Sequence, residues 1–169
     1  MKKLNALLLT LVMSLPLAVP SFAAEPQEVA KENAICLRAG DSVTVNGITI
    51  SMDEVDEAEA LNTARAGKHY LVPTRTWTKT EVFGDNATCK KAYGNTLAFD
   101  LDNRSAGDLT LDVWVGNSSD SFYCVMNTDR TYRVTLNGLF DFTGEVKATW
   151  SVYPSDLYNV NFTIDAYQY

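Results

Sequence analysis

Apolar and polar residues alternate along the chain from about residue 94 to the C-terminus, in short segments that each end at a turn signal. The clearest segments span residues 97–102, 109–115, 121–126, 131–136, 145–153 and 158–166. A period of two places successive side chains on opposite faces of a β-strand. Strands with one apolar and one polar face suit antiparallel sheets, and their spacing of roughly 10–15 residues favours a sandwich or barrel.

The N-terminal half of the sequence predicts a hairpin, a strand and a loop. Residues 42–50 form the hairpin, because Asn46-Gly47 supplies the two positive φ angles of a type I′ turn. Residues 70–82 are rich in Thr, Trp, Tyr and Val and predict one strand that bends near Pro73. Residues 84–93 are polar and predict a loop that contains Cys89.

One short amphipathic helix is predicted near residues 52–65. Apolar residues recur there every three to four positions from Met52 onward, and acidic residues gather in the first turns, where they suit the helix dipole. Ser51 is a candidate N-cap, and Gly67 would end the helix. The acidic face could bind a cation or a partner, although a solvated helix face is the simpler interpretation.

Together these elements predict a mainly β fold, an antiparallel β-sandwich of the jelly-roll type with one short helix. The sandwich is expected to be a single domain over residues 36–169. The sequence shows no internal repeat and no low-complexity tract. Architecture of this kind hosts many unrelated functions, so the fold alone does not identify one.

The N-terminus has the pattern of an export signal. Lys2 and Lys3 precede an apolar stretch, and Ser21-Phe22-Ala23 places small residues at the −3 and −1 positions of a cleavage site. We therefore predict a signal peptide over residues 1–23 and a flexible segment over residues 24–35. The alternative is an uncleaved anchor, but the apolar stretch is shorter and more broken than a membrane span of roughly 20 residues.

Export predicts a secreted, periplasmic or extracellular domain, with no membrane span in the mature chain. The formal net charge of −7 disfavours nucleic acid as a partner, because an acidic chain repels phosphate backbones. Neutral glycans, cations and cationic peptides remain compatible with this charge. The simpler interpretation is that negative charge keeps an exported protein soluble.

The chain carries three cysteines, Cys36, Cys89 and Cys124, which allow one disulfide and one remaining thiol in an oxidising compartment. A Cys89–Cys124 bridge is weakly preferred, and Cys36–Cys89 is nearly as plausible. The remaining thiol would be buried and inert, or would link two chains into a dimer.

No catalytic constellation emerges, so we predict a protein that is not an enzyme. Nucleophilic hydrolysis needs a general base, and the only histidine, His69, reads as a surface residue at a strand edge. The sequence has no Gly-x-Ser-x-Gly elbow and no Cys-x-x-Cys pair. Some pair of carboxylates is inevitable among 21 acidic residues, so such a pair does not indicate a glycosidase.

Calcium is the one metal that the sequence leaves open. Asp100 and Asp102 share the predicted outward face of a strand, and Asn103 and Asp108 lie in or beside the loop that follows. Oxygen ligands gathered in a loop can hold Ca²⁺. Acidic turns are also common without any metal, and no other cofactor is predicted.

Outward-facing aromatic residues are the best candidates for a binding site. Trp114 alternates with inward-facing residues, so its side chain is predicted to face outward. Trp150 instead occupies one of the positions of its strand that alternate toward the core, which we call the core parity. Tyr167 and Tyr169 have the outward parity of the last strand. Aromatic rings on a flat sheet can stack on sugars or anchor a protein partner. The alternative is that other elements cover them or that they form ordinary cross-strand pairs.

Three functional hypotheses follow. The leading one is a secreted, non-enzymatic β-sandwich module that binds a glycan or protein partner through an exposed face or its loops. The second is a structural or assembly component of the cell surface. The third is a small hydrolase whose site has no recognisable motif.

Overall fold

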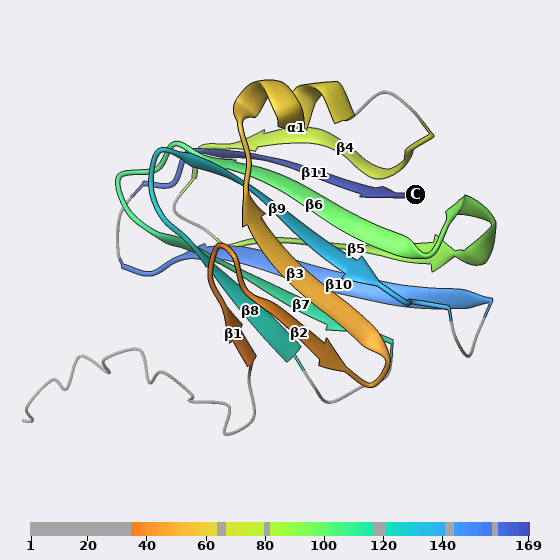
Figure 1. The fold of residues 1–169 in the computed structure, drawn as a ribbon. Helices are drawn as coiled ribbons and strands as arrows, with labels where there is room; N and C mark the ends of the chain where they lie inside the picture. Colours follow the sequence, from red (N-terminus) through yellow and green to blue (C-terminus); the bar gives the residue numbers. More distant parts are fainter. Residues whose placement is uncertain (1–34, 64–66, 80–81, 117–120, 141–143, 157–158) are drawn as a thin grey trace, which may run out of the picture. The chain divides into compact units, whose positions relative to one another are not determined.

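The computed structural model describes residues 35–63, 67–79, 82–116, 121–140, 144–156 and 159–169. Every described residue belongs to one compact unit within Lys31–Tyr169. This unit consists of two largely antiparallel sheets packed against each other, with a short helix on one side (Figure 1). The predicted signal peptide over residues 1–23 lies outside the described residues, as does the segment 24–35 apart from Ile35.

The two sheets contain five and six strands. The five-stranded sheet has the order β1 (Ile35–Leu37), β8 (Ser121–Met126), β7 (Leu109–Val115), β10 (Glu145–Pro154) and β5 (Phe83–Lys90). The six-stranded sheet has the order β2 (Ser42–Val45), β3 (Ile48–Glu54), β9 (Arg130–Asn137), β6 (Thr96–Asn103), β11 (Phe162–Gln168) and β4 (His69–Trp77). The described helical segments are α1 (Glu57–Thr63) and the 3₁₀ turn η1 (Lys91–Tyr93).

Strands β4 to β11 have the connectivity of one long hairpin folded over itself. They form four nested antiparallel pairs: β7 with β8, β6 with β9, β5 with β10, and β4 with β11. Successive pairs alternate between the two sheets, so the eight strands have jelly-roll topology. This confirms the predicted fold class. The N-terminal strands extend one side of the sandwich, with β1 parallel to β8 and the β2–β3 hairpin beside β9.

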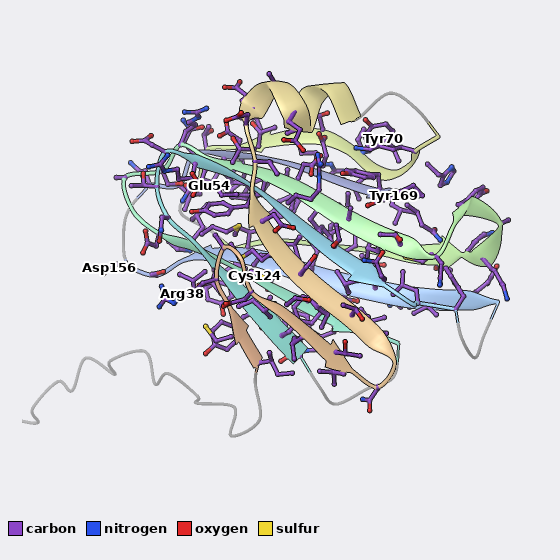
Figure 2. The ribbon with its side chains drawn as sticks, viewed as in Figure 1. Arg38, Glu54, Tyr70, Cys124, Asp156 and Tyr169 are labelled. Carbon is purple, nitrogen blue, oxygen red and sulfur yellow. The ribbon has the colours of Figure 1, made fainter. Side chains whose placement is uncertain are left out.

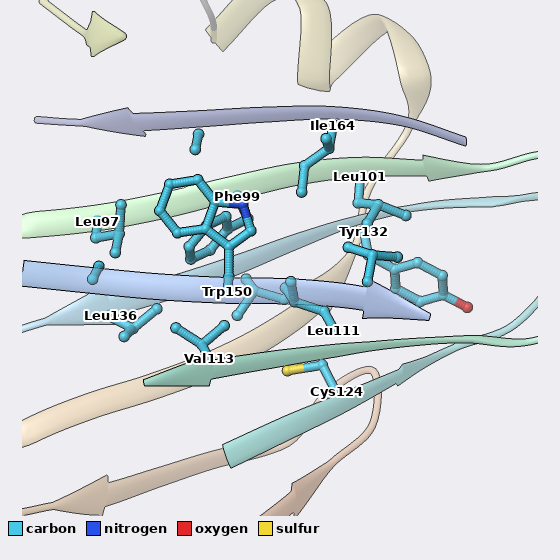
Figure 3. Close-up of a cluster of buried hydrophobic side chains, with 14 of the residues drawn as sticks. Leu97, Phe99, Leu101, Leu111, Val113, Cys124, Tyr132, Leu136, Trp150 and Ile164 are labelled. Atoms are coloured by element: carbon cyan, nitrogen blue, oxygen red, sulfur yellow. The ribbon is translucent and has the colours of Figure 1, made fainter. Parts of the chain in front are cut away.

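The core lies between the two sheets and is built from the inward positions of the alternating segments (Figure 3). The predicted parity is confirmed where the alternation is cleanest: Leu97, Phe99 and Leu101 on β6 are each at most 1% exposed. Trp150 of β10 is 1% exposed, and its ring meets that of Phe99 edge-on with 5.1 Å between centroids. Aromatic contacts of this kind join the two sheets across the core.

The helix begins later than the sequence predicted. Strand β3 continues to Glu54, because it pairs with β9 as far as Glu54 opposite Tyr132. Met52 is fully buried in this strand, and the Ser51 hydroxyl hydrogen-bonds to that of Thr135 across the sheet, so Ser51 is not an N-cap. The predicted helix is therefore confirmed only in its second half, as α1.

The predicted loop over residues 84–93 is wrong. Strand β5 pairs with β10 from Phe83 opposite Val152 to Lys90 opposite Glu145, and η1 follows it. Only Phe83 and Cys89 of this strand face the core and are buried, which explains why the sequence shows no clear alternation there.

The predicted strand over residues 70–82 is shorter than expected. It is irregular at Pro73, where the sequence predicted a bend. Strand β4 runs from His69 to Trp77. Val72 pairs with Ala166 and Arg75 with Ile164, so Pro73 and Thr74 lie opposite a single residue of β11. A bulge at the edge of the sheet suits Pro73, which has no N–H to donate to a neighbouring strand.

Replacing a core residue of the last strand should unfold the domain. Phe162 is 1% exposed, and its ring lies 5.8 Å from that of Phe83. Loss of a buried Phe costs about 3–5 kcal/mol, and an unpaired buried carboxylate adds to this cost, against a typical total stability of about 5–15 kcal/mol. We expect Phe162→Asp to abolish the cooperative thermal transition seen by circular dichroism.

The matched control is Thr88→Asp, an exposed residue of β5 opposite Lys147, which should melt as the wild type does. An unchanged transition in Phe162→Asp would contradict the core assignment.

Candidate functional site

The three predicted aromatic residues lie on different sheets. Trp114 lies on β7 of the five-stranded sheet, whereas Tyr167 lies on β11 of the six-stranded sheet and Tyr169 directly follows that strand. Tyr167 is 1% exposed and Tyr169 is 46% exposed. The structure therefore separates the predicted site into two groups of aromatic side chains.

The first group is a cluster of tyrosines on the six-stranded sheet. The Tyr167 ring lies 6.0 Å from that of Tyr70 and 5.9 Å from that of Tyr169, centroid to centroid. Tyr70 and Tyr169 are exposed and lie on the same side of the molecule (Figure 2). The ammonium of Lys68 lies 3.5 Å from the centroid of the Tyr167 ring, which explains why this outward residue is buried. At the same end His69 is exposed on edge strand β4, and its ring stacks on that of Tyr93.

The second group lies on the outer face of the five-stranded sheet, around Trp114. Asp112 and Trp114 alternate with buried Leu111 and Val113, so they face away from the core. Tyr123 of β8 is directly opposite Asp112 in the sheet. We call Trp114, Tyr123 and Tyr153, together with Asp112, the Trp114 face.

The aromatic residues of the Trp114 face occupy positions close to Asp112 in the sheet. Tyr153 of β10 is paired with Thr110, next to Asp112 on the same face. Burial raises the pKa of Tyr153, and the nearby charges of Asp112 and Tyr123 raise it further. Asp112 is only 8% exposed although it points outward, whereas the three aromatic side chains are each half-buried. Such a face offers rings for stacking and a carboxylate that accepts hydrogen bonds.

Two members of the Trp114 face were missed in the sequence. Tyr123 alternates with buried Phe122 and Cys124, so the same parity argument that selected Trp114 would have selected it. Tyr153 alternates with buried Val152 in the same way. Parity gives the direction of each side chain, but only the strand order brings these residues of β7, β8 and β10 together.

The four predicted calcium ligands do not converge. Asp100 accepts hydrogen bonds from Arg133, with Nε 2.7 Å from Oδ1, and from the Tyr167 hydroxyl at 3.0 Å. Asp102 pairs with Arg104 at 2.9 Å. Within the described residues, no three His, Cys, Asp or Glu side chains are grouped as metal ligands would be.

Asn103 holds a loop in place by hydrogen bonds and does not have the predicted role of a calcium ligand. Its amide nitrogen donates to the carbonyls of Gly107, Met126 and Asn127, each at 3.1 Å, and its Oδ1 accepts from the Ser105 N–H at 2.9 Å. Asn103 is fully buried and ties the loop after β6 to the end of β8. Asp108, at the other end of that loop, is half-buried. The geometry therefore gives the calcium hypothesis no support.

The preferred Cys89–Cys124 disulfide is wrong, because the two residues are far apart. All three cysteines are free thiols, with Cys36 exposed and the other two buried. Strand order puts Cys124 on β8 and Cys89 on β5, three strands away and further along the sheet, so more than about 20 Å separates them. A disulfide needs Cα atoms within about 7 Å of each other.

The other two pairings also fail on geometry. Cys36 and Cys89 lie on β1 and β5, at opposite edges of the five-stranded sheet. Cys36 and Cys124 lie on neighbouring strands, but Cys36 is paired with outward-facing Tyr123 whereas Cys124 faces the core. Their side chains therefore point to opposite faces of the sheet.

A small apolar pocket lies where β1 and the β2–β3 hairpin meet the ends of β7, β8 and β9. Its volume is about 70 Å³, and its walls include Ile35, Val45, Ile48, Val115 and Phe122. Four of these five residues are only half-buried. The pocket could accept a branched aliphatic group, but none of its walls belongs to the Trp114 face.

No protein-family model matches the chain, and a search of curated proteins finds no similar sequence. Among the described residues, no helix has both the length and the apolar character that crossing a membrane requires.

Thiol reactivity should follow the positions of the three cysteines. Burial raises the pKa of Cys89 to about 11 and that of Cys124 to about 12, so neither forms the reactive thiolate near neutral pH. We expect iodoacetamide to modify only Cys36 in the native protein, and all three cysteines in denaturant. Peptide mass spectrometry after sequential light and heavy labelling measures this. Equal native labelling of Cys36 and Cys124 would contradict the structure.

Proposed function

We propose that this domain is a secreted, non-enzymatic β-sandwich module that binds a glycan through the Trp114 face. The observation that carries the proposal is the gathering of Trp114, Tyr123 and Tyr153 around Asp112 on one outer face. No described element covers this face, whereas α1 lies on the outer side of the six-stranded sheet (Figure 1). A protein partner is the alternative ligand for the same face.

The chemistry of the face favours a sugar. Pyranose rings present apolar C–H groups to aromatic side chains and hydroxyls to polar ones, and Tyr and Trp combine an apolar ring with a polar edge. The Asp112 carboxylate can accept hydrogen bonds from hydroxyl groups beside those rings. The acidic charge of the chain excludes anionic glycans on electrostatic grounds, so a neutral or cationic glycan is the better match.

Export and the absence of an enzymatic role are parts of the proposal that rest on the sequence. The pattern over residues 1–23 supports export. His69, the only histidine of the chain, is stacked on Tyr93 at the end of β4, away from the carboxylate of the Trp114 face. A binding module needs neither a general base nor a nucleophile, and the Trp114 face offers an acceptor and stacking surfaces instead.

Truncating Trp114 should remove glycan binding. Aromatic residues that anchor a ligand commonly contribute at least about 1–2 kcal/mol, so Trp114→Ala should weaken binding about tenfold or more. We expect a glycan array to show a defined set of ligands for the wild-type protein and to show their loss in this variant. Isothermal titration with one of those ligands gives the change in affinity.

The matched control for this experiment is Tyr70→Ala, an exposed aromatic residue of the other sheet. It should keep wild-type binding. A wild-type glycan profile that Trp114→Ala leaves unchanged would reject the proposed face. If the array shows no glycan binding and a pull-down captures a protein, the Trp114 face would be a site for a protein partner and not for a glycan.

The edge of the five-stranded sheet supports a second candidate function, assembly of the protein at the cell surface. Cys36 is exposed on edge strand β1, beside Ile35 in the wall of the apolar pocket. An exported protein meets oxidising conditions, in which an exposed thiol can form a disulfide with another chain.

If the protein assembles through a disulfide between chains, formation of the dimer should depend on Cys36. If the protein assembles in this way, a non-reducing gel of the oxidised protein shows a covalent dimer that disappears in Cys36→Ser. Cys124→Ser, which removes a buried thiol, should leave the dimer in place. A monomer under oxidising conditions at high concentration would contradict the assembly function, and so would a dimer that survives in Cys36→Ser.

A further inference from the structure

Asp112 lies in a row of residues that crosses the outer face of the five-stranded sheet. Tyr123 of β8 is opposite Asp112 on one side, and Ser151 of β10 is opposite it on the other. Gly84 of edge strand β5 is opposite Ser151 in turn, so it ends the row at the edge of the sheet. Because neighbouring strands lie about 4.8 Å apart, the row covers roughly 10 Å between Asp112 and this edge.

Aromatic residues occupy positions on three of the four sides of Asp112. Tyr123 is beside it on β8, and Trp114 is two residues further along β7. Tyr153 of β10 lies on the side away from Trp114, because it is opposite Thr110 in the sheet. On the fourth side, towards β5, the row continues with a small hydroxyl side chain and then with glycine. The register of the strands therefore leaves this one side of Asp112 without a large residue in the row.

Within the described residues, nothing requires glycine at position 84. Gly84 does not have a positive φ, and a Cβ built there would meet only the carbonyl oxygen of Trp150, at an ordinary van der Waals distance of 3.7 Å. The other residues of β5 on this face, Asn86, Thr88 and Lys90, carry exposed side chains. Glycine weakens a strand, and it often marks a place where a ligand comes close to the backbone. The missing side chain thus leaves the row open at the edge of the sheet.

We propose that the Trp114 face binds the end of a neutral glycan chain, with the terminal sugar at Asp112 and the following sugars over Ser151 and Gly84. This inference rests on the proposed glycan-binding function and adds the direction in which the ligand lies. The terminal sugar stacks on an aromatic ring, and its hydroxyls donate to the Asp112 carboxylate. The Ser151 hydroxyl can donate to or accept from the second sugar. The chain leaves over Gly84 because aromatic residues occupy the other three sides of Asp112.

The dependence of binding on chain length tests the path over Gly84. The probes are mono-, di- and trisaccharides of glucose, galactose, mannose and N-acetylglucosamine, with affinities measured by NMR titration. For the sugar that binds, we expect the trisaccharide to bind about tenfold more tightly than the monosaccharide, the gain that one or two hydrogen bonds supply. Gly84→Gln fills the open end of the row, so it should reduce the affinity for the trisaccharide to that for the monosaccharide. The affinity for the monosaccharide should stay at the wild-type value.

The matched control is Thr88→Gln, an exposed position on the same face of the same strand. It should keep the wild-type dependence on chain length, and circular dichroism checks that both variants fold. A trisaccharide that binds Gly84→Gln as tightly as the wild type would overturn the inference and leave the glycan-binding function standing. If the wild type binds none of the probes and no glycan on the array, the proposed function fails and the inference fails with it.

A second measurement, on the wild-type protein alone, tests recognition of the chain end. The trisaccharide that binds best is attached to a surface through its reducing end in one arm and through its non-reducing end in the other. We expect binding in only one arm, because the sugar that carries the attachment cannot be the terminal sugar at Asp112. Equal binding in both arms would show that the site does not select an end, and would overturn the inference.

Discussion

The structure depends on one constraint: the central strands of both sheets each have a single apolar face, and these faces can leave water only by meeting each other. Neither sheet can bury its apolar side alone, and the nested pairing of β4 to β11 sends successive strand pairs to opposite sheets. Each large apolar side chain contributes about 1.5–3 kcal/mol when it is fully buried, and the ordering of the chain opposes this gain. The core therefore forms between the sheets and leaves both outer faces available for other chemistry.

The sequence predicted the parts of the fold in which burial alone determines the pattern. Leu97, Phe99 and Leu101 alternate without interruption because the whole of β6 lies in the centre of its sheet. Strand β5 is at an edge and buries only Phe83 and Cys89, so its polar residues resemble a loop. Edge strands are difficult to recognise for this physical reason: fewer of their positions are constrained by contact with the core.

The start of the helix was mispredicted because two periodicities overlap at the end of β3. Met52 follows Ile50 at a spacing of two and is buried in the strand. Asp53 and Glu54 resemble the first turn of a helix, yet Asp53 is opposite Arg133 in the sheet and Glu54 pairs with Arg130 at 3.2 Å. These pairings involve residues about 80 positions apart, which local periodicity cannot show.

The candidate sites show the same division between local and distant information. Parity correctly gave the outward direction of Trp114, but the partners of Trp114 come from β8 and β10 and depend on strand order. Parity also gave the outward direction of Tyr167, yet Lys68 covers its ring from a segment almost a hundred residues earlier. A side chain that points outward is therefore exposed only where no distant segment returns to cover it.

The edges of the sheets disfavour assembly by the addition of a strand from another chain. Strands β1 and β2, at one side of the sandwich, are only 3 and 4 residues long. On the other side, β4 carries Pro73 and a bulge, and β5 ends at Lys90. Short strands, proline, bulges and lysine are the features by which natural sheets avoid pairing with further chains. With its edges protected in this way, the domain has its outer faces left for contact with other molecules, and on the five-stranded sheet the Trp114 face combines several aromatic rings with a carboxylate.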